Sequence, residues 1–396
     1  MTADLLRDLT DDEARAALLK WAAVPPGAIP AWVAEMDYAP PQQVTDAVVA
    51  AVRAGRTAYA HTSATDAEGD GSDTDVVARA FAGFAARRWP SGDPASLGWT
   101  PTTAATTLAG DVTAALRIVF RHLVPAGPVV VPTPCYPPFL AFLDLVGREV
   151  VTIPTDPDAT RVGLDLDRVE AAFAAGARGL LLCSPHNPLG RAWTRGELTD
   201  LARLAERHGA RVVADEVHGP LTLPGATFTP YLDVDPRGVA VGSASKTFNV
   251  PGLRCAFVSA PADGDTARLR ALPTAENDGP SRLGVAAAEA AFTHGDAWLD
   301  ALLVRLDAQR TQLGDLLAAH LPQARWRPFE ATYLAWLDLR AYGVADPAAA
   351  ARAAGAWPAP GHDYAPGLDG HVRLNVATTP ERLEQLVVRI ARGLGA

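Results

Sequence analysis

A lysine stands among small hydroxyl-bearing residues in the segment 243–247, SASKT, directly after a predicted buried strand. The amine of Lys246 can be desolvated at such a strand end, which would make it a usable nucleophile. The hydroxyls of Ser243 and Ser245 and the guanidinium of Arg254 would together suit a phosphate dianion. The alternative is a solvated loop lysine near a surface arginine, and the other strand ends decide between the two.

Two further polar clusters follow predicted strands. Asn187, in the run SPHNPLG, comes after the strand Gly179–Cys183, and the run DEVH, with Asp215 and His218, ends the strand Arg211–Ala214. Ligands of open parallel sheets bind beyond the carboxyl ends of the strands, where all three clusters fall. In isolation, the aspartate could cap a helix, the asparagine could form a turn and the histidine could fill the core. Their ordered arrangement favours one shared site.

These side chains suit pyridoxal 5'-phosphate (PLP). The cofactor needs a carboxylate at its pyridine nitrogen, so that the nitrogen stays protonated and the ring accepts electrons, and Asp215 could supply it. Asn187 and His218 could hydrogen-bond the phenolate oxygen of the ring, and Lys246 could bind the cofactor covalently. The sequence has no GxGxxG or GxxxxGK[ST] loop, so a nucleotide-phosphate site lacks its usual signature.

The elements that would position these residues alternate between short apolar runs and amphipathic stretches, as in βαβ units around a mainly parallel sheet. Runs such as GLLLC are almost unbroken apolar, which is typical of strands covered on both faces. Helices are predicted at Val112–His122 and Arg195–His208, the second with a Thr194–Glu197 capping box and Gly209 at its end. The other candidate strands are Gly127–Val131, Val150–Ile153, Val239–Gly242 and Cys255–Ser259.

The pattern changes after about Ser281. A long helical region, Ser281–His320, precedes strands near Thr332–Leu339 and His371–Val376 and a final helix from Pro380. This order predicts a second α/β domain. The Gly/Asp-rich segment Asp66–Asp75 is expected to be a flexible surface insert.

Composition narrows the functional classes. The 396 residues are 48% hydrophobic and 20% charged, which predicts an ordered protein of two domains. The formal charge of −10 disfavours nucleic acid or an anionic membrane as partner. Three widely spaced cysteines predict neither a disulfide framework nor a metal site. The N-terminus lacks a signal-peptide core and no apolar run approaches the ~20 residues that span a bilayer, so a cytoplasmic protein is expected.

The motifs resemble a known family. Asn187-Pro188-x-Gly190, Asp215-Glu216 and Ser243-x-Ser245-Lys246 with Arg254 resemble the class I/II aminotransferases of PLP fold type I. The runs that resemble its MalY/PatB branch, the cystathionine β-lyases (cysteine-S-conjugate β-lyases), are AWVAEMDYAP, SPHNPLGRAWTRGEL, DEVH, SKTFNVPGLR and ATYLAWLDLR. Together these motifs extend from Trp32 to Asn375.

The resemblance implies a large PLP-binding domain, residues 46–280, with a mainly parallel seven-stranded sheet. A smaller α/β domain would span residues 281–396, and an N-terminal segment, 1–45, would pack on it. It also implies a homodimer with active sites at the subunit interface, in which Tyr59 reaches the phosphate of the neighbouring subunit. The family's Tyr-Gly-Tyr-Thr-like stretch is here Thr57-Ala58-Tyr59-Ala60, so this edge of the site is expected to differ.

The same resemblance implies residue roles within the site. Lys246 would bind PLP and act as the catalytic base, and Tyr136 would stack on the cofactor ring. Arg373 would clamp the substrate α-carboxylate in a pocket that Ala34 lines through its backbone, with Asn187 and Tyr136 also facing the substrate.

The phosphate would lie at a predicted helix start. Gly110, Asp111 and Val112 would present backbone N–H groups to it. The family has a small or apolar residue at the position of Asp111. The aspartate departs from this pattern and would place a negative charge beside the phosphate dianion. His218 stands where many aminotransferases have a tyrosine, and a histidine is usual in the lyase branch.

The implied reaction is β-elimination of cystathionine or another S-substituted L-cysteine to pyruvate, ammonia and a thiol, within amino-acid metabolism and methionine biosynthesis. A PLP-dependent amino-acid aminotransferase is the first alternative, since the same residues support transamination. A lyase-like regulator that binds a transcription factor is the second. No side chain stands out from the sequence as a selector of the thiol leaving group.

Overall fold

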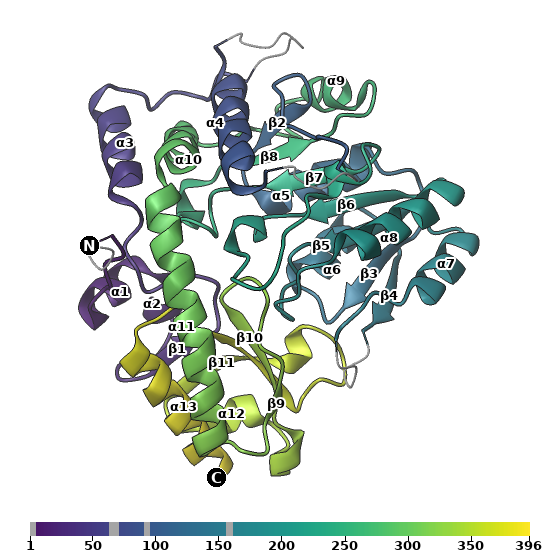
Figure 1. Ribbon diagram of the computed structural model, residues 1–396. Coiled ribbons are helices and arrows are strands. Elements are labelled where there is room, and N and C mark those ends of the chain that lie inside the picture. The colour runs from purple at the N-terminus through teal and green to yellow at the C-terminus, as the bar shows by residue number, and fades with distance from the viewer. Residues whose placement is uncertain (1–4, 63–70, 91–95, 156–160) are drawn as a thin grey trace.

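The computed structural model describes residues 5–62, 71–90, 96–155 and 161–396, and its larger sheet has seven strands (Figure 1). These strands are β2 Thr106–Ala109, β3 Val129–Thr133, β4 Val150–Pro154, β5 Gly179–Cys183, β6 Arg211–Asp215, β7 Val239–Gly242 and β8 Ala256–Ser259. Their order is β2-β8-β7-β6-β5-β3-β4, and only β8 runs antiparallel to its neighbours. The mainly parallel seven-stranded sheet is therefore confirmed.

All six strands predicted for this region are present, and the seventh, β2, was not predicted. Its sequence, TTLA, is short and contains two threonines, so it has no long apolar run to mark it. It forms the edge of the sheet beside β8. β3 begins two residues later than expected, at Val129 rather than Gly127.

Helices cover both faces of this sheet, as the unbroken apolar runs require. In β5, Leu181 packs with the apolar side chains of α5 Val112–His122 and α6 Pro138–Leu145. Its neighbours Leu180 and Leu182 point to the opposite face, against α7 Leu166–Ala174 and α8 Arg195–Arg207. Successive strand side chains alternate between faces, so every β5 side chain is buried.

The local signals for α8 are confirmed. The Thr194 hydroxyl accepts from the Glu197 backbone N–H at 3.3 Å, and the Glu197 carboxylate accepts from the Thr194 N–H at 2.7 Å. The helix ends one residue earlier than predicted, with His208 as its C-cap. α5 has the predicted bounds, and Asp111 is its N-cap.

A second sheet has five strands, in the order β1-β11-β12-β10-β9. They are β1 Ile29–Ala31, β9 Arg325–Trp326, β10 Leu334–Asp338, β11 Ala356–Pro360 and β12 His371–Asn375. The two strands predicted here are present as β10 and β12. β1 comes from the N-terminal segment and pairs with β11. The division of the chain into domains at residues 45 and 280 stays a prediction.

The long helical region after Ser281 is two helices, α10 Arg282–His294 and α11 Asp296–His320. Gly295 separates them, and a Cβ there would lie 2.4 Å from both the Ala291 carbonyl oxygen and the Phe248 ring. α11 runs along the second sheet beside the final helix α13 (Figure 1). The remaining helices are α1 Asp11–Ala17, α2 Leu19–Ala22, α3 Gln42–Arg53, α4 Asp73–Arg88, α9 Asp265–Arg270, α12 Pro347–Ala353 and α13 Pro380–Leu394.

The expectation of a flexible insert at Asp66–Asp75 is wrong for its last residues, while residues 66–70 lie outside the described part. Ser72 caps α4 by accepting from the Asp75 N–H at 3.1 Å, and both side chains are buried. Serine followed by acidic residues is an N-cap signal, which the Gly/Asp composition concealed. In the described residues, no helix combines the length and the apolar character needed to cross a membrane.

Candidate active site

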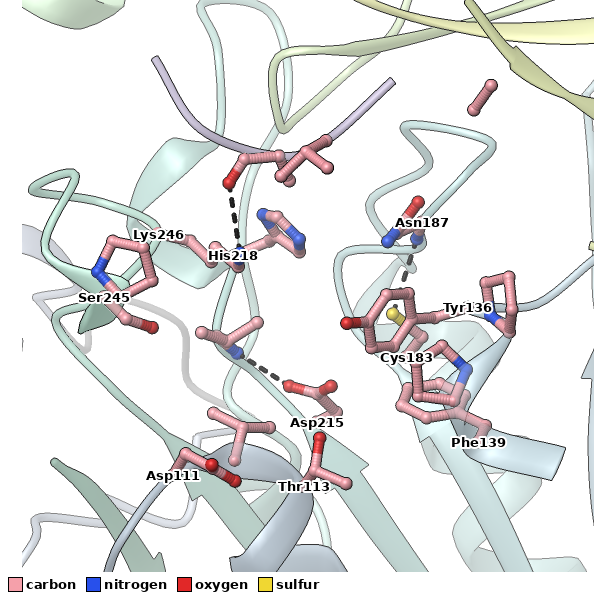
Figure 2. A pocket seen from close by; sticks show the side chains of 18 of the residues that line it. Asp111, Thr113, Tyr136, Phe139, Cys183, Asn187, Asp215, His218, Ser245 and Lys246 are labelled. Atoms are coloured by element: carbon pink, nitrogen blue, oxygen red, sulfur yellow. Dashed lines mark hydrogen bonds between the residues drawn. The ribbon is translucent and has the colours of Figure 1, made fainter. Parts of the chain in front are cut away.

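A cavity of about 590 Å³ lies beyond the carboxyl ends of β3, β5, β6 and β7, where residues of β11 and β12 also line it. Twelve of the fourteen predicted site residues line it, and they come from both sheets and the N-terminal segment. They are Ala34, Asp111, Val112, Tyr136, Asn187, Asp215, His218, Ser243, Ser245, Lys246, Arg254 and Arg373. Figure 2 shows Tyr136 and Asn187 across this cavity from Lys246 and Ser245.

Lys246 follows β7, and its Nζ donates to the Ala34 carbonyl oxygen at 3.0 Å. Burial lowers the pKa of this amine to about 8, and the positive charge of Arg373 acts in the same direction. The sequence contains only one other lysine, Lys20, which is fully buried in an ion pair with Asp37 at 2.9 Å. Lys246 is thus the single lysine amine available to react in the cavity.

Asp215 is the last residue of β6 and is 4% exposed. Burial raises the pKa of its carboxyl to about 6. Two smaller effects lower this pKa: the carboxylate accepts a hydrogen bond from the Val217 N–H at 3.1 Å, and the positive charge of Lys246 is nearby. A carboxylate with so little compensation would gain from a cation beside it.

His218 and Tyr136 line the same cavity as this carboxylate, and both lie above it in the view of Figure 2. Burial lowers the pKa of His218 to about 3, aided by the charges of Lys246 and Arg373, so the ring is neutral at physiological pH. Its Nδ1 is buried without a hydrogen-bond partner among the described residues. Burial, and then the charge of Asp215, raise the pKa of Tyr136.

Arg373, in β12, connects the two sheets. Its Nη1 donates to the Asn187 side-chain oxygen at 3.0 Å, and its Nη2 donates to the Trp32 carbonyl oxygen at 2.5 Å. The guanidinium lies over the Tyr364 ring, 5.0 Å from its centroid. These contacts hold a buried cation in one orientation, and no carboxylate of the described residues pairs with it, which leaves its charge for an anionic ligand.

The loop that carries Asn187 is held by a close approach of backbones. Gly190 has φ +62°, and a Cβ on it would lie 2.3 Å from Phe329 Cβ. The Glu330 N–H donates to the Gly190 carbonyl oxygen at 2.7 Å. The Asn-Pro-x-Gly motif therefore requires a glycine at this position both for its positive φ and for the close approach of Phe329.

The predicted phosphate region contains an ion pair that the sequence did not predict. Asp111 accepts from the Ala114 N–H at 2.8 Å through Oδ1, as a helix cap, and binds Arg254 Nη2 at 2.7 Å through Oδ2. Arg254 has φ +53°, a conformation that L-residues rarely adopt and that concentrates at functional sites. Asp111 and Arg254, the two charged residues at the border of this region, therefore form an ion pair with each other.

Other predicted phosphate residues have different surroundings. The Ser243 hydroxyl donates to the Cys255 carbonyl oxygen at 2.7 Å and accepts from the Ser245 N–H at 3.1 Å, so it orders its own loop. Gly110 lies outside the cavity lining, and a Cβ on it would lie 3.2 Å from the Gly279 carbonyl oxygen. Tyr59 is 96% exposed and also outside the lining. Their phosphate roles stay predictions.

Sequence reasoning missed three aromatic residues of the site. Trp32 lines the cavity and holds Arg373 through its carbonyl, and Tyr364 stacks on the same guanidinium. Tyr333 Oη donates at 3.1 Å to the Ala34 oxygen that also accepts from Lys246. Trp32 and Tyr333 stand in motifs that marked the lyase branch, whereas Tyr364 carries no local signal.

The residues present fit PLP. The buried Asp215 carboxylate would be compensated by a protonated pyridine nitrogen, and the amine with a lowered pKa could attach an aldehyde. Arg254 and the N-terminus of the eleven-residue α5 suit a phosphate. Within the described ranges, no group of three or more His, Cys, Asp or Glu side chains could hold a metal ion.

Comparisons with known proteins identify the family of the chain. The family model for class I and II aminotransferases matches residues 98–390. A candidate cystathionine β-lyase of Mycobacterium tuberculosis is 38% identical, over 100% of this chain and 99% of its own. Cystathionine β-lyase PatB of Bacillus subtilis is 31% identical, over 93% and 92%. The crystal structure of a candidate PLP-dependent β-cystathionase of Corynebacterium diphtheriae has a TM-score of 0.88 at 31% identity, over 99% of both chains.

Proposed function

Because the chain belongs to the class I and II aminotransferase family, we propose that it is a PLP-dependent carbon–sulfur β-lyase. It cleaves cystathionine or another S-substituted L-cysteine to pyruvate, ammonia and a thiol. The observation that carries the proposal is the half-buried Lys246 amine, with its lowered pKa, in one cavity with Asp215 and Arg373. The relatives named as cystathionine β-lyases, which match along nearly the whole chain, support the reaction.

Several side chains would hold the cofactor, each by a different contact. Lys246 would bind it covalently, Asp215 would pair with its pyridine nitrogen and Tyr136 would stack on its ring. Asn187 and His218 would lie near its phenolate oxygen. When bound, PLP supplies an electron-accepting ring that stabilises negative charge at the substrate α-carbon.

The chain's own residues would then position the substrate and move its protons. Arg373 would bind the substrate α-carboxylate through its planar fork, in the orientation that Asn187 and Trp32 impose. The neutral Lys246 Nζ would take the α-proton, which its lowered pKa permits near pH 8. Breaking the carbon–sulfur bond then releases the thiol, and water converts the remaining fragment to pyruvate and ammonia.

Transamination is the alternative that the same residues support, since it begins with the same proton removal. The test is to incubate the PLP-loaded protein with L-cystathionine alone and, separately, with an amino acid and 2-oxoglutarate. The proposal expects pyruvate and thiol from cystathionine without an oxo-acid. Product formation only in the presence of 2-oxoglutarate would identify an aminotransferase.

The finer parts of the proposal concern the assembly and its place in the cell. We propose a cytoplasmic homodimer that acts in methionine biosynthesis, in which Tyr59 completes the site of the partner subunit. The 96% exposure of Tyr59, outside the cavity of its own subunit, supports such a role. Size measurement in solution, with Tyr59→Phe tested for weaker PLP binding, checks both points.

A further inference from the structure

Arg352 and Asp363 line the active-site cavity and have no part in the reaction described above. They come from one stretch of chain, which continues from α12 through β11 into the 3-10 turn Gly361–Asp363. The next residue, Tyr364, stacks on Arg373. The two charges therefore lie on the wall of the cavity that also contains the predicted α-carboxylate site.

The Arg352 guanidinium donates few hydrogen bonds to the described residues. Its Nη2 donates to the Pro358 carbonyl oxygen at a long 3.5 Å, and its Nε is buried with no hydrogen-bond partner in the described part of the chain. No carboxylate among those residues forms an ion pair with it. Arg352 is half-buried and lines the cavity, so its positive charge without a carboxylate partner among those residues favours an anion bound beside it.

Asp363 is the acidic counterpart. Its side chain is 52% exposed and lies beside the His362 ring, with Oδ1 3.7 Å from the ring Nε2. Arg352 and Asp363 do not pair with each other although both line the cavity, in contrast to Asp111 and Arg254. One cation and one anion therefore stay available to a ligand on this wall.

The cavity lining also contains apolar side chains. Trp32, Pro137, Phe139, Ala359 and Pro360 face the same cavity. These side chains suit methylene groups and a sulfur atom, which make no demand for hydrogen bonds. The cavity thus has a proposed carboxylate site at Arg373, a second pair of charged residues and several apolar side chains in its lining.

We propose that Arg352 and Asp363 bind the carboxylate and the ammonium group of a second amino-acid moiety on the substrate sulfur. The inference rests on the proposed function and deepens it. The preferred substrates are cysteine thioethers that end in an α-amino acid, such as cystathionine, rather than S-alkylcysteines. A site built for charged groups rejects analogues without them far more strongly than an apolar pocket rejects a smaller chain.

The test compares three substrates by kcat/KM for pyruvate release. L-Cystathionine has both distal charges, S-(2-carboxyethyl)-L-cysteine has only the carboxylate, and S-ethyl-L-cysteine has neither. Arg352→Met is expected to lower the ratio of cystathionine to S-ethylcysteine about 10- to 100-fold, as for loss of a charge-assisted hydrogen bond. Asp363→Asn is expected to lower it only about threefold, because this carboxylate is half exposed.

The carboxyethyl substrate separates the two contacts. Its ratio to S-ethylcysteine is expected to fall in Arg352→Met and to stay within twofold in Asp363→Asn. Arg203→Met is the matched control, because Arg203 lies in α8 outside the cavity and is 71% exposed. Arg352→Lys, which keeps the charge but loses the fork, is expected to give an intermediate ratio and serves if the methionine variant does not fold.

Ratios within twofold of wild type in the Arg352 variants would overturn the inference while leaving the lyase in place. A wild-type protein that releases pyruvate from none of the three substrates would overturn the proposed function, and the inference with it. The two failures are distinguished by the wild-type measurement alone.

Discussion

The two ends of the cavity hold their charges in different ways. At the inner end, Asp215 and Arg373 are buried and Lys246 is half-buried. All three are oriented by backbone groups or by the Asn187 amide. At the phosphate end, Asp111 and Arg254 are 33% and 61% exposed and hold each other by an ion pair. Exposed ion pairs contribute about 0–1 kcal/mol, so this end can exchange partners at little cost.

This difference indicates which part of the site is ready before any ligand arrives. At the inner end, the amine proposed for proton transfer and the guanidinium proposed to bind a carboxylate are already in place, because the fold itself orients them. At the proposed phosphate end, we expect the ion pair between Asp111 and Arg254 to open when an anion binds. The four predictions below test this contrast.

The largest effect is expected at the inner end for Lys246→Ala. Loss of the covalent attachment and of the base should lower kcat for pyruvate release by about 10³-fold or more. Pyruvate formation from cystathionine at saturating PLP measures it, with Arg203→Met as the control. Retention of a tenth of the wild-type activity would show that another group removes the proton.

Arg373→Met should lower kcat/KM by about 30- to 1,000-fold, because a buried and fully oriented charge contact is lost. PLP binding should change much less, since this arginine is assigned to the substrate. Titration of the apoprotein with PLP, beside steady-state kinetics, separates the two effects. An equal loss of PLP affinity would show that Arg373 contacts the cofactor rather than the substrate.

The pKa of Lys246, lowered to about 8, predicts a pH dependence. The neutral amine is the reactive form, and its fraction rises as the pH passes upward through the pKa. The rate at which the apoprotein binds PLP covalently should therefore rise about tenfold from pH 7 to 9 and then level off. A rate that keeps rising to pH 10.5 would show an unperturbed lysine at the inner end.

The smallest effect is expected at the phosphate end, for Asp111→Asn. Asparagine still caps α5, but it removes a negative charge beside the expected phosphate and frees Arg254. PLP should bind about three- to tenfold more tightly, as expected from an exposed charge interaction. Arg254→Met should weaken PLP binding. Weaker binding in Asp111→Asn would instead show that the ion pair positions the arginine for the phosphate.

The sequence predicted the inner end better than the phosphate end, for a physical reason. Lys246, Asp215 and Asn187 each follow a strand of one parallel sheet, so their meeting point follows from topology alone. The pairing of Asp111 with Arg254 depends on how two side chains share an exposed edge, which no local pattern records. The same holds for Arg352 and Asp363.

The errors in the fold have similar origins. β2 was missed because four residues with two threonines give no apolar run, and pairing with β8 is what makes them a strand. The start of α4 was taken for an insert because its glycines and aspartates outweighed a serine cap. Tyr364 enters the site only through the packing of the second sheet against the first.

The identity of the lysine that binds the cofactor tests the central claim most directly. Borohydride reduction of the PLP-loaded protein, followed by peptide mass spectrometry, would locate the pyridoxyl label, and the chain offers only Lys20 and Lys246. We expect the label on Lys246 alone, since Lys20 is buried in its ion pair with Asp37. A label on Lys20, or no label on either lysine in a protein that still releases pyruvate, would contradict it.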